Sequence, residues 1–417
     1  MAKLIINGGK KLEGMLEIDS SKNAILPIIA STLLTEEKVI LKKVPNISDV
    51  DKMLEILKSL GGEVLREKDV VIIDNSNIKN LEIPASLTSA IRSSIFILGP
   101  MLAMYKKAKV AYPGGCDIGS RPIGLHLFGL RELGAKVTEE YGYIDCDGCS
   151  MKPKLIHLDF PSVGATENLM MASVFLTGET ILNNVAKEPE IVDLANFINK
   201  MGGRIEGAGT STIRIFGVKR LKGVEYTPIG DRIIAGTYMI AGAITMGRVK
   251  LLNTNFEHVL SLINKLRKSG CNVDFFGGRI VVENFTRPKS CSFETLAYPG
   301  FPTDLQPQLS ILSAIAKGTS IITENLFETR FRHLSELAKM GARVEYRAQT
   351  AIIKGVPSLF GAEVESFDLR GGASMVLAGL VAKGKTVVNN TEYIDRGYSS
   401  IEGQLQQLGA DILRIDR

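Results

Sequence analysis

The segment AYPGGCDIGSRPIG, at residues 111–124, contains the side chains best suited to chemistry. A single cysteine, Cys116, follows a Gly-Gly pair and precedes an arginine, Arg121, that stands before proline. A free thiol has a pKa of about 8.5, so near neutral pH it is mostly protonated and can donate a proton. A nearby guanidinium favours the thiolate, which is a nucleophile. Because glycines and a polar DIGS run are typical of an exposed loop, we interpret Cys116 as a reactive thiol.

The other cysteines and the histidines are interpreted as structural or surface groups. Cys146 and Cys149 resemble half of a zinc site, but the sequence has no second CxxC and no histidine pair near them. The histidines are dispersed along the chain, at His126, His157, His258 and His333. No glycine motif of the dinucleotide-binding kind follows a predicted strand. We therefore expect neither a metal nor a cofactor.

Composition restricts the class of protein. The chain has 417 residues, more than one ordinary core holds, so two domains are expected. A net charge of +5 is too small and too dispersed to indicate nucleic-acid binding. The N-terminal segment lacks the apolar core of a signal peptide, and no uninterrupted apolar run approaches the roughly 18 residues of a membrane span. With scattered cysteines that form no disulfide framework, these features predict a cytoplasmic protein with no membrane or nucleic-acid partner.

An internal repeat predicts the elements that must position these residues. A pattern of an apolar residue, glycine, a small residue, any residue and a β-branched residue recurs about every 70 residues. Each copy follows an amphipathic helix, so its glycine is predicted to cap that helix. The chain is therefore interpreted as a sixfold repeat of an α/β unit. The glycines are Gly61, Gly134, Gly202, Gly270, Gly341 and Gly409.

Each repeat also contains a helix that is apolar on nearly all sides and is therefore predicted to be buried. One of them, within IFILGPMLAMY, is expected to meet a turn or kink at Gly99–Pro100. Three such helices side by side in each domain would bring their N-terminal ends together. Helix N-termini favour anions, which predicts a site for a multiply anionic substrate. The polar residues at these ends are Lys22, Arg92, Ser162, Asp231, Arg232, Asp304 and Arg370.

Several longer motifs of the chain resemble those of a known family. SSKNAILP, PGGCDIGSRP, LDFPSVGATEN, AKEPEIVDLANFI, GFPTDLQ, FETRF and IDRGY together resemble the UDP-N-acetylglucosamine 1-carboxyvinyltransferases, which are enolpyruvyl transferases of the EPSP synthase-like superfamily. The resemblance runs in register over essentially the whole chain. It implies an α/β fold of two inside-out α/β barrel domains, each made of three βαβαββ repeats. The domains are expected at 22–229, which carries a Cys loop at about 112–122, and at 1–21 with 230–417.

The resemblance also implies a reaction. The enolpyruvyl group of phosphoenolpyruvate would pass to the 3-hydroxyl of UDP-N-acetylglucosamine with release of phosphate, the first committed step of peptidoglycan synthesis. This addition–elimination needs a proton donor, a base and cations for phosphate and carboxylate. The resemblance assigns Cys116 as the proton donor, covalent adduct site and fosfomycin target, and Asp304 as the base. From the sequence alone, Asp304 is equally well explained as a capping or first-turn residue. The two small molecules are the expected partners of a monomer.

Binding residues are implied in the same way. Lys22, Arg121 and Arg396 would hold phosphoenolpyruvate, with Lys22 and Arg396 also counted as catalytic. Arginine suits this task because it grips phosphate or carboxylate through two parallel hydrogen bonds. The other implied substrate-binding residues are Asn23, Arg92, Pro122, Ile123, Gly124, Leu125, Ser162, Val163, Gly164, Leu326, Arg330 and Arg370.

The chain departs from the family pattern at Gly124, where Asp is usual, and at Ile234, where Glu is common. These changes bear on nucleotide affinity and interdomain contacts more than on the reaction.

Three other functions agree less well with the sequence. The shikimate-pathway enolpyruvyl transferase lacks this cysteine loop. A non-catalytic paralogue that binds nucleotide sugar is disfavoured by Cys116 and Asp304, although Gly124 and Ile234 keep it open. A repeat scaffold for protein partners does not explain cations at buried helix starts.

Overall fold

The computed structural model describes residues 2–114, 119 and 122–416. These residues form two units, each with its own hydrophobic core. We call residues 2–19, 119 and 230–416 the terminal unit, because it contains both ends of the chain. We call residues 20–114 and 122–229 the central unit.

Short strands form small sheets in both units. Those of the central unit are β3 (Val39–Leu41), β4 (Glu63–Glu67), β5 (Val70–Asp74), β6 (Lys107–Ala111), β7 (Lys136–Glu140), β8 (Tyr143–Asp147), β9 (Leu155–His157), β10 (Glu179–Asn183), β11 (Arg204–Glu206), β12 (Thr212–Phe216) and β13 (Glu225–Tyr226). Those of the terminal unit are β1 (Lys3–Asn7), β2 (Glu13–Glu17), β14 (Arg248–Leu252), β15 (Asn272–Phe276), β16 (Arg279–Glu283), β17 (Phe293–Glu294), β18 (Thr319–Thr323), β19 (Arg343–Arg347), β20 (Thr350–Lys354), β21 (Leu359–Phe360), β22 (Glu363–Glu365), β23 (Ala382–Lys383), β24 (Lys385–Asn389) and β25 (Asp411–Ile415).

One topology recurs in these sheets. A middle strand pairs in parallel with the strand that opens its repeat, and antiparallel with a hairpin, as in the order β11-β12-β10-β9. The same order appears in β13-β3-β5-β4, β15-β16-β14-β2 and β17-β18-β20-β19. In the sheet β6-β8-β7, an isolated parallel bridge between Glu82 and Lys109 takes the place of the opening strand.

The two units exchange their opening strands along the chain. Strand β2 precedes the first helix of the central unit in sequence, yet it pairs in parallel with β14 of the terminal unit. Strand β13 precedes the first helix of the terminal unit, yet it pairs with β3 of the central unit. The sheet β22-β24-β1-β25 is completed by strands from both ends of the chain, because β1 lies between β24 and β25.

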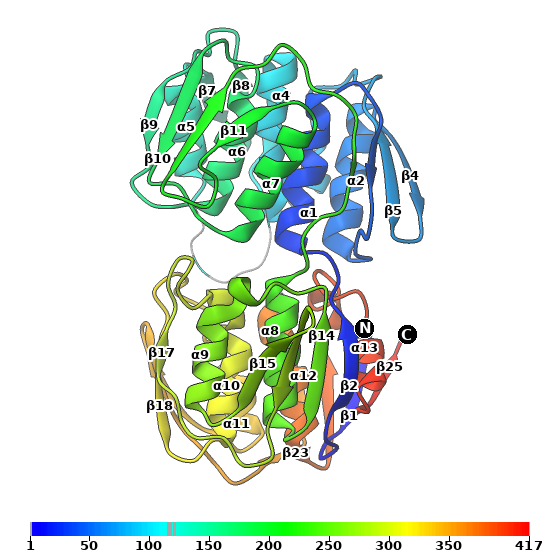
Figure 1. Ribbon diagram of the computed structural model, residues 1–417, viewed down its shortest axis with the longest axis vertical. Helices are drawn as coiled ribbons and strands as arrows, with labels where there is room; N and C mark the ends of the chain where they lie inside the picture. Colours follow the sequence, from blue (N-terminus) through cyan, green and yellow to red (C-terminus); the bar gives the residue numbers. More distant parts are fainter. Residues whose placement is uncertain (1, 115–118, 120–121, 417) are drawn as a thin grey trace. The chain divides into compact units, whose positions relative to one another are not determined.

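Each repeat contributes one inner helix, and Figure 1 shows these helices inside each unit with the strands around them. The inner helices are α1 (Lys22–Ser31) with the 3₁₀ turn η1 (Thr32–Leu34), the 3₁₀ helix η2 (Arg92–Ile97) with α4 (Leu98–Tyr105), α6 (Val163–Ser173), α8 (Arg232–Ile244), η4 (Thr303–Leu305) with α10 (Gln306–Ile315), and α12 (Leu369–Val381). The second helix of each repeat is α2 (Ser48–Leu60), α5 (Gly124–Glu132), α7 (Pro189–Lys200), α9 (Leu260–Lys268), α11 (His333–Lys339) or α13 (Ile401–Gln407). The remaining short helices are α3 (Ala85–Thr88), η3 (Phe256–Val259) and η5 (Thr391–Tyr393).

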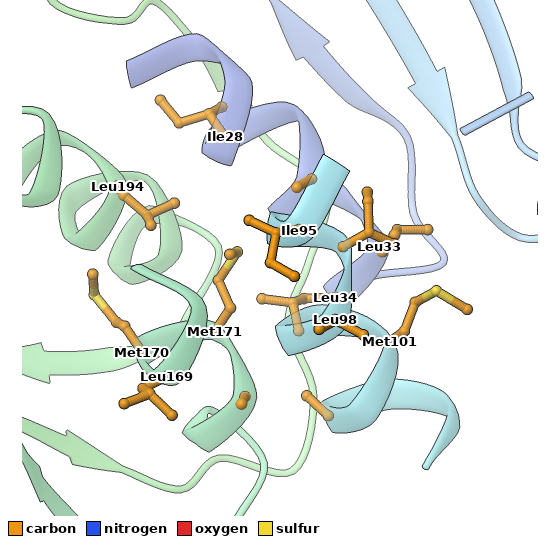
Figure 2. Close-up of a cluster of buried hydrophobic side chains, with 14 of the residues drawn as sticks. Ile28, Leu33, Leu34, Ile95, Leu98, Met101, Leu169, Met170, Met171 and Leu194 are labelled. Atoms are coloured by element: carbon orange, nitrogen blue, oxygen red, sulfur yellow. The ribbon is translucent and has the colours of Figure 1, made fainter. Parts of the chain in front are cut away.

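The inner helices supply a large share of each core. In the central unit, Figure 2 shows apolar side chains of α1, of η2 with α4, of α6 and of α7 gathered in one cluster. Ile28, Leu98 and Met170 are among its fully buried members. Their burial confirms the prediction that the all-round apolar helices lie inside. Together with the βαβαββ order of the strands, it confirms the predicted fold class.

The repeated glycines have the conformation that the sequence predicts. All six adopt the left-handed backbone region that glycine reaches most easily, with φ of +110° at Gly61 and +94° at Gly409. The expected kink at Gly99–Pro100 is wrong in detail. Both residues lie in the first turn of α4, directly after the 3₁₀ helix η2. Proline is tolerated there because N–H groups of a first turn have no intrahelical acceptor.

Candidate active site

Asp304 forms the centre of an ion cluster in the terminal unit. Its Oδ1 accepts a hydrogen bond from Nη2 of Arg330 at 2.8 Å. Its Oδ2 accepts two from Arg370, from Nε at 3.2 Å and from Nη2 at 3.0 Å. The arginine side chains are only 2% and 4% exposed, whereas that of Asp304 is 26% exposed. Two buried cations therefore orient a carboxylate that solvent can still reach.

The helix starts of the terminal unit come together around Arg370. Asp368 caps α12, where its Oδ1 accepts from the amide of Arg370 at 3.0 Å. Asp231 caps α8 in the same way. Burial alone would lower the pKa of Arg370, but the neighbouring Asp304 and Asp231 carboxylates and the Tyr398 phenol outweigh this effect, so the pKa is raised overall. The charged groups at the starts of α8, α10 and α12 thus act on one another, as predicted for three buried helices side by side.

Glu324 is a site residue that sequence reasoning missed. It follows β18, is fully buried, and links the Asp304 turn to Leu326, one of the predicted substrate-binding residues. Its Oε2 accepts from the hydroxyl of Thr303 at 3.0 Å, in the turn η4 that contains Asp304. Its Oε1 accepts from Thr295 at 2.8 Å and from the amide of Leu326 at 3.0 Å. The one available signal was a glutamate directly after an apolar strand.

Two more predicted residues lie in the terminal unit. Leu326 is half-buried in the segment after β18. Arg396 is half-buried in the turn that follows η5. Lys22 and Arg396, both predicted to bind phosphoenolpyruvate, thus belong to different units.

Lys22 begins α1 in the central unit, with Asn23 half-buried beside it. Its Nζ lies 2.8 Å from Oδ2 of Asp49 in α2, and the two side chains are 11% and 4% exposed. The ammonium group is therefore held in place by an acidic partner. Sequence reasoning missed Asp49, because an acid in the first turn of an amphipathic helix is also the usual complement of the helix dipole.

The start of α6 provides backbone donors. Ser162 is its N-cap, and its Oγ accepts from the amide of Ala165 at 3.3 Å. The N–H of Ser162 donates to the carbonyl of Phe160 at 2.7 Å, so this amide is already used. Val163 and Gly164 occupy the first turn, where N–H groups have no intrahelical acceptor. Of the three predicted substrate-binding residues at this helix start, Val163 and Gly164 are therefore the ones whose backbone N–H groups suit a bound ligand.

His126 lies beside this helix start, buried in α5. A Cβ built at Gly164 would stand 2.9 Å from its Cε1. Asn168 accepts from the amide of Gly99 through Oδ1, so its Nδ2 donates to Nδ1 of His126 at 3.1 Å. Burial, and then the charge of Arg92, lower the pKa of His126 to about 3, which keeps the ring neutral. His126 is buried, as expected for a structural group, and it lies near two of the predicted substrate-binding residues, Arg92 and Gly164.

The segment 122–125 leads into α5. Pro122 is exposed, Ile123 is the buried N-cap, and Leu125 is half-buried. Gly124 is exposed as the first residue of the helix, and a Cβ built there meets nothing within 4 Å. Cys116 and Arg121 lie outside the described residues.

Of the remaining cysteines, three are buried and one lies at the surface. Burial raises the pKa of the Cys146 and Cys271 thiols to about 12. Cys291 is buried and Cys149 is exposed. Within the described part of the chain, no group of three His, Cys, Asp or Glu side chains is arranged to hold a metal ion. No helix among the described residues is long and apolar enough to cross a membrane.

Comparison with known proteins identifies the family to which the chain belongs. The sequence profile of EPSP synthase (3-phosphoshikimate 1-carboxyvinyltransferase) matches residues 6–405. The chain belongs to this family of carboxyvinyltransferases. It is 49% identical over 416 residues to UDP-N-acetylglucosamine 1-carboxyvinyltransferase 2 of Caldanaerobacter subterraneus subsp. tengcongensis, with 100% of both chains covered. It is 48% identical over 417 residues to the enzyme of the same name from Clostridium tetani, again with 100% of both chains covered.

Solved structures agree on the fold. The enolpyruvyl transferase NikO from Streptomyces tendae superposes with a TM-score of 0.88 at 23% identity, over 99% of this chain and 98% of that one. EPSP synthase from Acinetobacter baumannii superposes with a TM-score of 0.77 at 19% identity, over 100% of both chains. The predicted enolpyruvyl transferase fold is confirmed.

Proposed function

We infer that this chain transfers the enolpyruvyl group of phosphoenolpyruvate to the 3-hydroxyl of UDP-N-acetylglucosamine and releases phosphate. The full-length match to relatives named for this activity carries the inference. The ion cluster around Asp304 supports it. The product commits the sugar nucleotide to peptidoglycan synthesis. We place the enzyme in the cytoplasm, where both phosphorylated substrates are made, and propose that it acts as a monomer of two domains, 22–229 and 1–21 with 230–417.

Asp304 is the proposed base. Two guanidinium groups favour the ionised form of a carboxylate, so Asp304 is charged before the reaction begins. Arg330 and Arg370 also fix its orientation, since they bind different oxygens. When the sugar 3-oxygen attacks C2 of phosphoenolpyruvate, its proton passes to Asp304.

Cys116 is the proposed acid. Its thiol proton goes to the methylene carbon of phosphoenolpyruvate, which leaves C2 cationic and open to attack. In the second half of the reaction, the bond from C2 to the phosphate oxygen breaks. The proton held by Asp304 passes to the departing phosphate, and the methyl carbon returns a proton to the Cys116 thiolate as the double bond forms again. Lys22, Arg121 and Arg396 stabilise the charge on the departing phosphate and on the carboxylate. The ion pair with Asp49 orients the ammonium group of Lys22.

The nucleotide is proposed to bind the central unit. The amides of Val163 and Gly164 suit a diphosphate because they add to the positive end of a helix dipole. Arg92 supplies a full charge close to the same helix start, since it acts electrostatically on His126. Asn23, Pro122, Ile123, Gly124, Leu125 and Leu326 complete the proposed contacts to the sugar nucleotide.

Acceptor choice tests the function. Purified enzyme should release phosphate from phosphoenolpyruvate with UDP-N-acetylglucosamine, and not with shikimate 3-phosphate or without an acceptor. Release with shikimate 3-phosphate would assign the chain to the shikimate pathway. If no phosphate is released with either acceptor, the result would support the non-catalytic paralogue.

The thiol is tested separately. Cys116→Ser should abolish turnover and leave the thermal unfolding midpoint unchanged. Cys149→Ser removes an exposed thiol and should keep full activity. Fosfomycin should add one adduct to the wild type and to Cys149→Ser, and none to Cys116→Ser, by intact-mass measurement. An adduct on Cys116→Ser would contradict the assignment.

A further inference from the structure

The turn that carries Arg396 is anchored at both ends by side chains from distant parts of the chain. It follows η5 and runs over residues 394–399, within the terminal unit. The first anchor comes from β25, close to the C-terminus. The second comes from the residue at the end of the first chain segment of this unit, just after β2.

Arg414 of β25 is the first anchor, and all three of its guanidinium nitrogens are engaged. Nη2 and Nη1 donate to the two carboxylate oxygens of Asp395, at 2.7 and 3.1 Å. Nε and Nη2 donate to the two carboxylate oxygens of Glu402 in α13, at 2.9 and 3.2 Å, and Nη1 donates to the hydroxyl of Thr391 at 3.3 Å. The Arg414 side chain is 17% exposed. Such a two-bond grip is the strongest and most directional pairing open to a carboxylate. Arg414 makes one such grip on Glu402 and one on Asp395, the residue next to Arg396.

Asp19 is the second anchor. Its Oδ2 accepts from the hydroxyl of Ser399 at 3.0 Å and from Nε2 of Gln404 at 3.2 Å. Gln404 in turn accepts from the hydroxyl of Tyr238 at 2.6 Å, on the inner helix α8. The far end of the turn is thus tied to the core of the unit.

These contacts bear on function because Arg396 lies on a turn and not within a helix or strand. A guanidinium that grips an anion must be held within roughly 0.5 Å of its productive position, and a loop alone rarely does this. We propose that Arg414 is a positioning residue for Arg396: its ion pair with Asp395 fixes the turn so that Arg396 meets phosphoenolpyruvate in one orientation. The inference rests on the role proposed above for Arg396. The competing explanation is that Arg414 only ties β25 to α13 through Glu402.

Arg414→Gln and the milder Asp395→Asn separate the two explanations. Both should raise KM for phosphoenolpyruvate by about tenfold, the loss expected for one misaligned ionic contact. Both should leave KM for UDP-N-acetylglucosamine within about twofold. Fosfomycin adduct stoichiometry gives the active fraction, so partial unfolding does not count as lost affinity.

Arg287→Gln is the matched control. Arg287 lies in the same unit and donates to the carbonyls of Ile315, Ala316 and Val356, at 2.7, 2.8 and 2.8 Å. Its replacement should lower the thermal unfolding midpoint and leave both KM values unchanged. If Arg414→Gln and Asp395→Asn behave like this control, Arg414 has a purely structural role and the inference is overturned.

A double-mutant cycle with Arg396→Lys completes the test. If Arg414 acts through Arg396, Arg414→Gln should change KM for phosphoenolpyruvate by less than about twofold in the Arg396→Lys background. A full tenfold effect in that background would show that Arg414 acts elsewhere. If Arg396→Lys alone leaves this KM unchanged, the proposed role of Arg396 fails, and the inference fails with it.

Discussion

Oδ2 of Asp304 accepts hydrogen bonds from both Nε and Nη2 of Arg370, at 3.2 and 3.0 Å. The proposed base is therefore held by one planar fork, and the opposite oxygen is held by Arg330. A lysine in place of Arg370 would keep the charge but could not form the fork.

Arg370→Lys should lower kcat at least tenfold, because an ammonium group cannot reproduce the two-nitrogen grip on Oδ2 and orients the Asp304 carboxylate less strictly. Steady-state kinetics with both substrates at saturation measures this effect. Arg204→Lys, at an exposed surface pair, is the matched control and should change nothing. Full kcat in Arg370→Lys would show that the fork does not orient the base.

At position 324, replacement of the carboxylate by an amide should be tolerated, whereas truncation of the side chain should not. Glu324→Ala leaves Thr303 and the amide of Leu326 without their buried acceptor, so we expect a loss of about 2–4 kcal/mol in unfolding free energy and a lower kcat. In Glu324→Gln the amide oxygen can replace Oε1, and the hydroxyl of Thr303 can accept from the new NH₂ group. Urea unfolding and kinetics compare the two variants. Equal damage in both would mean that the negative charge, and not the hydrogen bonding, is required.

Glu167 should make stability depend on pH. It is fully buried in α6, and neither carboxyl oxygen has a hydrogen-bond partner among the described residues. Burial, and then the charges of Glu190 and Glu188, raise its pKa well above the ordinary 4.5. The folded state keeps this proton, whereas the unfolded state loses it as pH rises. The residue's contribution is therefore most favourable below the unfolded pKa and falls by up to about 1.4 kcal/mol per pH unit above it.

Glu167→Gln is neutral at every pH, so its advantage over the wild type in unfolding free energy should be close to zero near pH 4.5 and should grow as the pH rises toward 7. Urea unfolding of both proteins across this range measures the difference. A difference that stays constant with pH would contradict a protonated Glu167.

Gly124→Asp should strengthen nucleotide binding. The position is exposed, begins α5 and has open space beside it, so a carboxylate fits and suits the helix start. It would restore the residue usual in the family, and KM for UDP-N-acetylglucosamine should fall severalfold. Gly124→Ala adds the Cβ without the charge and should leave this KM unchanged. If the two variants match, the family carboxylate has no role in nucleotide binding here.

Much of the fold was predictable because its signals are local. The capping glycines such as Gly61 stop amphipathic helices by backbone conformation alone, and Ser162 and Asp231 cap inner helices at the positions expected. The exchange of β2 and β13 between the units had no local signal. Each is a short strand whose partner lies more than 180 residues away in the sequence, and pairing over such distances is decided by the whole fold.

The residues of the candidate site also divide into those with a local sequence signal and those without one. Residues at inner helix starts, such as Lys22 and Arg370, were identified because a charge at the end of an apolar helix is conspicuous. Asp49, Glu324 and Arg414 were missed because each acts on a residue brought near only by folding. Their sequence positions, in a helix first turn, after a strand and in a terminal strand, are ordinary for charged residues.

The most direct test of the central claim is a competition for one carbon-labelled phosphoenolpyruvate. Wild-type enzyme is given UDP-N-acetylglucosamine and shikimate 3-phosphate together, and the products are identified by mass spectrometry. We predict that the label appears in the enolpyruvyl ether of UDP-N-acetylglucosamine, with phosphate formed in equal amount. Label in the enolpyruvyl ether of shikimate 3-phosphate, or in neither acceptor, would contradict the function proposed here.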